Sequence, residues 1–209
     1  MESLDLIKQS RLIAVIDMLD RGREDLLPML GALLSGGIVV VELDFADQFT
    51  PELMRAAAVT FPDMQIGAGG LYRADDVASA IASGARFVSS FGDSPEAAAI
   101  CREHEMLYIP GCVTPTEITA ALSDGADLIK FTPASVFGGI STIKTLGKMF
   151  PDAPFVVSGG VTEDTVGDYL ALRSVVACAD PFMIDTTLDN TAAITARLVG
   201  KYSRTFGVR

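Results

Sequence analysis

Leu128-Ile129-Lys130-Phe131-Thr132-Pro133-Ala134 is an apolar, β-type run with a lysine inside it, and it is one of eight such runs along the chain. The runs lie at about residues 12–16, 38–43, 64–68, 86–90, 106–110, 127–131, 154–158 and 174–178. Stretches rich in Ala, Leu and Glu with helical spacing separate them. Strands that alternate with helices pair in parallel through right-handed crossovers, so eight units favour an α/β fold closed into a (β/α)8 TIM barrel.

Signals at the ends of the helical stretches support this division. Thr50-Pro51-Glu52, Ser94-Pro95-Glu96 and Thr114-Pro115-Thr116-Glu117 each place a hydroxyl cap before a proline, and the third adds a capping-box glutamate. Glycines such as Gly84 and Gly125 stand where helices end. An open doubly wound sheet is the alternative, but the turn after the first run lacks the glycine-rich dinucleotide fingerprint. We therefore expect a single barrel domain over residues 1–209.

Composition describes a compact globular protein. The 209 residues are 49% hydrophobic with a mean hydropathy of +0.38, which is ample for a sizeable core. No apolar run reaches the roughly 18 residues that cross a bilayer. The start, Met1-Glu2-Ser3-Leu4-Asp5, lacks the basic region of a secretory signal. These features predict a cytoplasmic protein without a membrane partner.

Charge and cysteine content further limit the binding partners and metal sites that we expect. A net charge of −11 argues against nucleic acid, whose phosphate backbone is bound through excess lysine and arginine. Cys101, Cys112 and Cys178 are odd in number and lack metal-site spacing, so we expect small buried thiols. His104, the only histidine, follows a predicted helix away from the strand ends and indicates a surface or capping residue.

Active residues of barrel enzymes lie at the carboxyl ends of the strands, and most polar candidates of this chain fall there. Strand alternation puts Val40, Glu42 and Asp44 on one face of the second run. It likewise puts Leu128, Lys130 and Thr132 on one face of the sixth. We therefore expect a glutamate and a lysine to point together into the barrel mouth.

A buried lysine beside a carboxylate suits imine chemistry. Burial lowers the pKa of an ammonium group, and the free amine attacks a ketone to form a Schiff base. In this reading Lys130 forms an iminium with a 2-oxo acid, and Glu42 shuttles protons during dehydration and C–C cleavage. A partly buried Glu–Lys ion pair that only closes the barrel is the structural alternative.

From about Arg11 to Asp185 the chain resembles the 2-keto-3-deoxy-6-phosphogluconate (KDPG)/4-hydroxy-2-oxoglutarate (KHG) aldolase family. The strand Val40-Val41-Glu42-Leu43 resembles the one that carries the family's proton-shuttling glutamate. Lys130-Phe131-Thr132-Pro133-Ala134 resembles the Lys-Phe-Phe-Pro-Ala segment with the Schiff-base lysine. Three further segments are similar to family segments: Ile66-Gly67-Ala68-Gly69, Pro110-Gly111-Cys112-Val113-Thr114-Pro115-Thr116-Glu117 and Val157-Ser158-Gly159-Gly160-Val161.

The resemblance implies a class I aldolase that needs no metal or other cofactor, releases pyruvate and an aldehyde, and assembles as a homotrimer. It implies that Lys130 and Glu42 are catalytic. The expected substrate-binding residues are Gly69, Gly70, Pro110, Gly111, Thr132, Ser158, Gly159 and Gly160. The turn at Ser158-Gly159-Gly160 is expected to receive a substrate phosphate.

Several positions depart from the family pattern. Ala46 and Gly70 replace an arginine and a threonine that help to hold the pyruvate carboxylate, and Asp17 replaces an arginine of the first strand. Ala179-Asp180-Pro181 replaces the Gly-Gly-Ser turn of the phosphate site, so a carboxylate stands near the expected phosphate. The mouth thus loses cations and gains acids, which favours a substrate without phosphate.

Two other functions stay open. A degenerate barrel would bind a 2-oxo acid or another small molecule without turnover. A metal-dependent lyase would use Asp17, Glu42 and Asp44 as oxygen ligands for Mg²⁺ or Mn²⁺. Ligand-induced stabilisation without product would indicate the first, and loss of activity on chelation the second.

Overall fold

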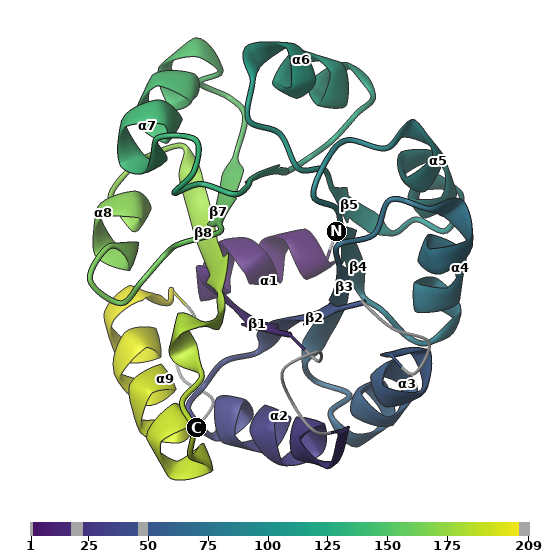
Figure 1. The fold of residues 1–209 in the computed structure, drawn as a ribbon, viewed down its shortest axis with the longest axis vertical. Helices are drawn as coiled ribbons and strands as arrows, with labels where there is room; N and C mark the ends of the chain where they lie inside the picture. Colours follow the sequence, from purple (N-terminus) through teal and green to yellow (C-terminus); the bar gives the residue numbers. More distant parts are fainter. Residues whose placement is uncertain (1, 18–22, 46–49, 205–209) are drawn as a thin grey trace.

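The computed structural model describes residues 2–17, 23–45 and 50–204. Eight parallel strands form a nearly closed barrel, which confirms the predicted fold (Figure 1). The strands are β1 (Leu12–Ile16), β2 (Val40–Asp44), β3 (Gln65–Gly69), β4 (Phe87–Ser89), β5 (Leu107–Ile109), β6 (Ile129–Phe131), β7 (Phe155–Ser158) and β8 (Val175–Asp180). Their order around the barrel is β5-β4-β3-β2-β1-β8-β7-β6, so consecutive strands are neighbours except for β5 and β6, and β8 returns to β1.

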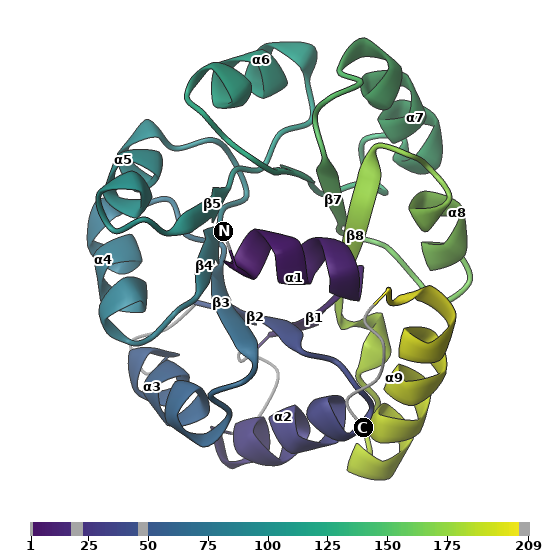
Figure 2. The ribbon, with the colours of Figure 1, turned by 180° about the vertical axis from the view of Figure 1, so that it is seen from behind.

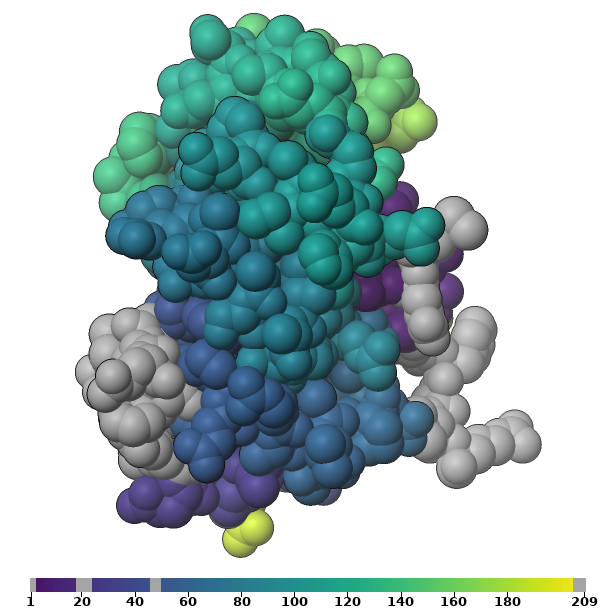
Figure 3. All heavy atoms as spheres, turned by 90° about the vertical axis from the view of Figure 1, so that its right-hand side faces the viewer, coloured from purple at the N-terminus to yellow at the C-terminus, as the bar shows by residue number. Residues whose placement is uncertain are grey.

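Helices surround the barrel on its outer side (Figure 1). They are α2 (Leu26–Ser35), α3 (Thr50–Thr60), α4 (Ala74–Ala82), α5 (Pro95–Glu103), α6 (Pro115–Ser123), α7 (Gly139–Met149), α8 (Val166–Leu170) and α9 (Leu188–Tyr202). Figure 3 shows the outer surface of the molecule from one side. Two short 3-10 helices, η1 (Arg23–Asp25) and η2 (Pro181–Met183), precede α2 and follow β8. No helix within the described ranges is long and apolar enough to cross a membrane.

The first helix, α1 (Glu2–Ser10), does not belong to this ring. Figure 2 shows it lying across one end of the barrel. Ile7 of α1 is fully buried and packs in the barrel interior with residues such as Ile13, Phe87 and Leu128. The helix therefore plugs the end at which the strands begin, and the opposite end is left as the mouth.

Alternation along the strands builds two separate cores. The inward-facing cluster contains Val40 and Leu128, which confirms the predicted face of β2 and β6. The outward-facing residues, such as Val41 and Ile129, pack against the helix ring in a larger cluster. Because strand residues alternate between these layers, Glu42 and Lys130, two residues beyond Val40 and Leu128, also face inward.

The predicted capping box and glycine helix ends are formed. Thr114 and Glu117 form the capping box of α6: the Thr114 hydroxyl accepts from the Glu117 amide, and the Glu117 carboxylate accepts from the Thr114 amide at 2.8 Å. Gly84 and Gly125 adopt φ of +96° and +87°, the left-handed conformation in which glycine ends a helix without strain. The three cysteines are free and buried, as predicted.

A seam in the barrel lies between β5 and β6. These strands are not neighbours in the sheet order, and among the described residues an isolated bridge between Gly111 and Lys130 is the one β-bridge that joins this side. At that bridge the Lys130 amide donates to the Pro110 carbonyl at 2.8 Å, and the Cys112 amide donates to the Lys130 carbonyl at 2.9 Å. Lys130 is thus anchored on both sides of its peptide unit.

Candidate active site

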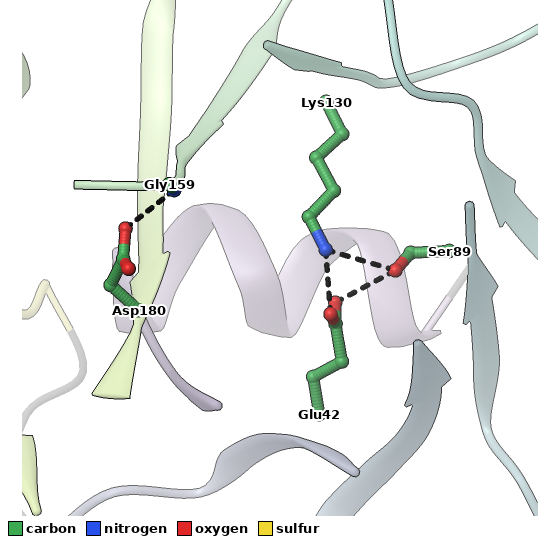
Figure 4. A network of polar contacts seen from close by, with 5 residues as sticks. All are labelled: Glu42, Ser89, Lys130, Gly159 and Asp180. Atoms are coloured by element: carbon green, nitrogen blue, oxygen red, sulfur yellow. Dashed lines mark hydrogen bonds and ion pairs between the residues drawn. The ribbon is translucent and has the colours of Figure 1, made fainter. Parts of the chain in front are cut away.

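Three polar side chains meet inside the barrel mouth. Lys130 Nζ lies 2.6 Å from Glu42 Oε1 and donates a hydrogen bond of 3.1 Å to Ser89 Oγ. Ser89 Oγ in turn donates to Glu42 Oε2 at 2.9 Å. Figure 4 shows the three side chains pointing toward one another from β6, β2 and β4. We call them the Lys130 cluster.

The Lys130 cluster is almost entirely removed from bulk solvent. Lys130 is 3% exposed, Glu42 is 4% exposed and Ser89 is fully buried. Each charge is therefore paired and hydrogen-bonded, the arrangement that makes burial of an ion tolerable. The sequence-based expectation that Glu42 and Lys130 face each other is met by this geometry.

Ser89 stands among the polar residues at the predicted strand ends, but the sequence pattern assigned it no role in the site. It ends β4, and its side chain has the same parity as the inward-facing Phe87. That parity, applied to the fourth run as it was to the second and sixth, places a hydroxyl inside the mouth. What parity does not give is the hydrogen bond to Glu42, which depends on how β2 and β4 lie on either side of β3.

Gly69 and Gly70, predicted to bind substrate, lie beside the carboxylates of the mouth. A Cβ on Gly69 would come within 2.4 Å of Glu42 Oε1, so only glycine leaves room for that side chain. Gly70 has φ of +77°, and a Cβ there would lie 3.0 Å from both Asp44 Oδ1 and the Phe91 ring. These glycines therefore shape the wall behind Glu42 and Asp44.

Of the other predicted residues, Pro110 and Gly111 form the seam beside Lys130, as described above. Thr132 is buried just beyond β6. Ser158 ends β7, where its carbonyl accepts from the Ala134 amide at 2.8 Å. The next carbonyl, that of Gly159, accepts from the Ser135 amide at 2.9 Å, which joins this turn to the segment after Lys130.

Two of the acids predicted at the mouth, Asp17 and Asp44, interact electrostatically. Burial raises the pKa of Asp44, and the nearby carboxylates of Asp17 and Glu42 raise it further. The attraction of Lys130 and a backbone hydrogen bond from Phe45 act in the opposite direction. Asp17 and Asp44 are thus close enough to interact. Ala46 lies outside the described residues.

The side chain of Asp180, the last residue of β8, occupies the turn that follows β7. Its Oδ2 accepts hydrogen bonds from the amides of Gly159, at 2.7 Å, and Val161, at 3.1 Å. Figure 4 shows Asp180 and Gly159 apart from the Lys130 cluster, on the β7 and β8 side of the mouth. The turn in which a substrate phosphate was expected therefore already holds a carboxylate of the protein.

The remaining candidates do not assemble into a second centre. Across residues 2–17, 23–45 and 50–204, no group of three or more His, Cys, Asp and Glu residues could hold a metal ion. The proposed ligand set of Asp17, Glu42 and Asp44 is thus not formed, and Glu42 is directed to Lys130. His104 is exposed at the end of α5, as predicted.

Fold and site together define a barrel enzyme of the aldolase type, with a lysine and a carboxylate paired inside its mouth. A family model described as "KDPG and KHG aldolase" matches residues 4–197. The chain therefore belongs to the KDPG and KHG aldolase family, a family of lyases.

Individual relatives agree with this assignment. The chain is 33% identical over 180 residues to a 2-dehydro-3-deoxy-phosphogluconate aldolase of Treponema pallidum, covering 86% of this chain and 85% of that protein. It is 30% identical over 185 residues to one of Haemophilus influenzae, covering 88% and 86%. Among solved structures, KDPG aldolase of Legionella pneumophila, with pyruvate captured at low pH as a covalent carbinolamine, has a TM-score of 0.85 and 29% identity, covering 95% of this chain and 96% of that one.

Proposed function

We propose that this protein is a class I aldolase that cleaves a 2-keto-3-deoxy or 4-hydroxy-2-oxo acid to pyruvate and an aldehyde. Lys130 forms the imine, Glu42 moves the protons, and the aldehyde portion carries no phosphate. The contact of 2.6 Å between Lys130 Nζ and Glu42 Oε1 is the observation that carries this proposal. It gives a direct path for the proton that the ammonium must lose before it can act as a nucleophile.

The reaction begins at the C2 carbonyl of the substrate. Glu42 takes a proton from the Lys130 ammonium, and the free amine adds to C2 to form a carbinolamine. Glu42 then returns a proton to the C2 hydroxyl, which leaves as water, and the iminium forms. The positive nitrogen now lies one bond from C2, where it accepts the electron pair of the next step.

Cleavage follows from that charge. The Glu42 carboxylate removes the proton of the C4 hydroxyl, the C3–C4 bond breaks, and its electron pair moves through C2 to the iminium nitrogen. The aldehyde leaves and an enamine stays on Lys130. Protonation at C3 and hydrolysis of the resulting iminium release pyruvate and restore the lysine.

Ser89 acts as a positioning residue in this scheme. Its hydroxyl donates to Glu42 Oε2 and accepts from Lys130 Nζ, so it holds both groups in one geometry. Such orientation supplies part of the rate because reacting groups then need no reorganisation. Pro110 and Gly111 fix the backbone of Lys130, while Gly69 keeps the space that Glu42 fills.

Borohydride trapping with pyruvate, read by intact mass and peptide mapping, tests the imine step. One reduced pyruvate is expected on Lys130, and Lys130→Ala should abolish it. Lys148→Ala, which removes an exposed lysine of α7, is the matched control and should trap as the unchanged protein does. Absence of any adduct on folded protein in excess pyruvate would overturn the proposal.

The runner-up function is binding of a 2-oxo acid without turnover. Ala46 and Gly70, which replace the arginine and threonine expected to hold the pyruvate carboxylate, favour it, because an acid held by fewer contacts is less well oriented for imine formation. In that case pyruvate or a longer 2-oxo acid would raise the melting temperature, and no aldehyde would form. A homotrimer is also proposed on family resemblance, and light scattering during size-exclusion chromatography measures it.

A further inference from the structure

The turn after β7 has the form of an anion-binding site. Gly159 and Gly160 have φ of +87° and +93°, and the amides of Gly159 and Val161 converge on one point. Successive main-chain N–H groups that face one concavity bind anions in many proteins. Side chains are excluded from the turn, because a Cβ on Gly159 would lie 2.7 Å from Pro133 Cα and one on Gly160 would lie 2.4 Å from Ser135 Oγ.

The anion in this concavity belongs to the protein. Asp180 ends β8 and is 8% exposed, and its Oδ2 accepts from the Gly159 and Val161 amides. Burial raises the pKa of Asp180, while the amides of Val161, Gly159 and Gly160 and the charge of Lys130 pull it down. The carboxylate is therefore held by the same donors that an external oxyanion would need.

We infer that Asp180 determines specificity: it decides whether the enzyme accepts a substrate whose aldehyde portion is charged. This inference rests on the proposed function. A substrate phosphate or carboxylate would have to displace a carboxylate tethered beside its donors, which acts at a high effective concentration. It would also meet a like charge in a partly desolvated place. The enzyme therefore takes 2-oxo acids whose aldehyde portion is uncharged.

The same geometry favours hydroxyl groups on that portion. A carboxylate has about four lone-pair positions, and hydrogen bonds from the Gly159 and Val161 amides use two of them. A neutral polyol donates hydrogen bonds to a carboxylate, whereas a phosphate dianion only accepts. The substrate class that fits is an unphosphorylated, hydroxylated 2-oxo acid of the sugar-acid type.

Two variants separate the charge of Asp180 from its volume. Asp180→Ala empties the turn, and Asp180→Asn keeps it filled with a neutral group that still accepts from the amides. Asp152→Ala is the control, because it removes one negative charge from an exposed loop away from the mouth. The readout is kcat/KM for 2-keto-3-deoxygluconate with and without a 6-phosphate, beside trapping with pyruvate.

The unchanged enzyme should prefer the unphosphorylated acid. In Asp180→Ala the ratio of the two kcat/KM values should move toward the phosphorylated acid by roughly 10- to 100-fold, the value of one or two charge-assisted hydrogen bonds. Asp180→Asn should move the ratio less, and Asp152→Ala should not move it. An unchanged ratio in folded Asp180→Ala that still traps pyruvate, or a preference of the unchanged enzyme for the phosphorylated acid, would overturn the inference.

A second measurement keeps the inference separate from the proposed function. Binding of inorganic phosphate, measured by calorimetry or as a rise in melting temperature, needs no turnover. Asp180→Ala should bind phosphate at the emptied turn and the unchanged protein should not. If trapping at Lys130 fails, the proposed function fails and phosphate binding still decides the role of Asp180. If Asp180→Ala does not fold, Asp180→Ser, which retains a small polar group, takes its place in both measurements.

Discussion

A hydroxyl between two charges does more than fill space. Ser89 Oγ is the only group in the described part of the chain that hydrogen-bonds both Lys130 Nζ and Glu42, and it lies in the dry interior. Hydrogen bonds to charged groups are worth more than neutral ones, about 1.5 to 3 kcal/mol each. The two ionic side chains would find no substitute partner in water if the hydroxyl were removed.

Ser89→Ala is expected to lower kcat by roughly 10-fold or more, because Glu42 loses a donor that fixes its orientation. The pH profile of kcat should also shift, which a purely structural loss would not cause. The measurement is kcat against pH, compared with Ser123→Ala, which removes an exposed hydroxyl from α6. A profile that keeps its shape and height would contradict a positioning role for Ser89.

Gly69→Ala tests the wall behind Glu42. The new methyl would lie 2.4 Å from Oε1, so the carboxylate must move away from Lys130. Since a misplacement of about 1 Å can cost roughly 100-fold in rate, we expect a large loss of kcat with the fold retained. Gly200→Ala in α9, where a Cβ meets nothing within 4 Å, is the control and should leave kcat unchanged. Equal activity in both variants would show that Glu42 needs no such space.

At the scale of elements, the eight apolar runs and the signals at helix ends account for much of the agreement between sequence and structure. The eight predicted runs correspond to the eight strands, and the first run, residues 12–16, coincides with β1. The other runs differ from their strands by one or two residues at one or both ends: β6, for example, begins at Ile129, and β8 continues to Asp180. Alternation predicted Glu42 and Lys130 because it is a local property of each strand. The hydrogen bonds of Ser89 and Asp180 were not predictable, because they depend on side chains from different strands and on the path of a turn.

Thr114→Ala tests one of these helix ends. Loss of the capping-box hydroxyl should lower the free energy of unfolding by about 1 kcal/mol, because the first turn of α6 loses a partner for its amide. Chemical denaturation measures this change. Thr119→Ala on the exposed side of the same helix removes a hydroxyl without a cap and should be neutral or slightly stabilising. Equal effects from both substitutions would mean that the capping box adds nothing to stability.

Charge acts on the molecule as a whole. The protein has a net charge of −11, and its barrel mouth is also acidic. Asp44 is one of the carboxylates at the mouth. Its pKa is raised above the ordinary value of 3.8, so the folded state binds a proton more tightly than the unfolded state does. Asp44 therefore contributes stability below pH 3.8, and this contribution is lost as the pH rises through the raised pKa.

Asp44→Asn should consequently gain stability relative to the unchanged protein as the pH rises above 3.8. Asp185 supplies a control of opposite sign, because hydrogen bonds from Asn190 and its neighbours lower its pKa. Asp185→Asn should lose relative stability above pH 3.8, and the difference should vanish as the pH falls. Melting temperatures of the three proteins across this range measure both effects. Parallel curves would contradict the role given to Asp44.

The seam between β5 and β6 is a weak point of the barrel, and it lies at Lys130, the proposed nucleophile. Both hydrogen bonds at that seam use the peptide groups on either side of the Lys130 α-carbon. A fluctuation that separates β5 from β6 therefore also frees the backbone that holds the Lys130 side chain. On warming, the Lys130 amide should therefore begin to exchange with deuterium at the temperature at which activity begins to fall. The barrel would then be closed at the residue that is proposed to form the imine.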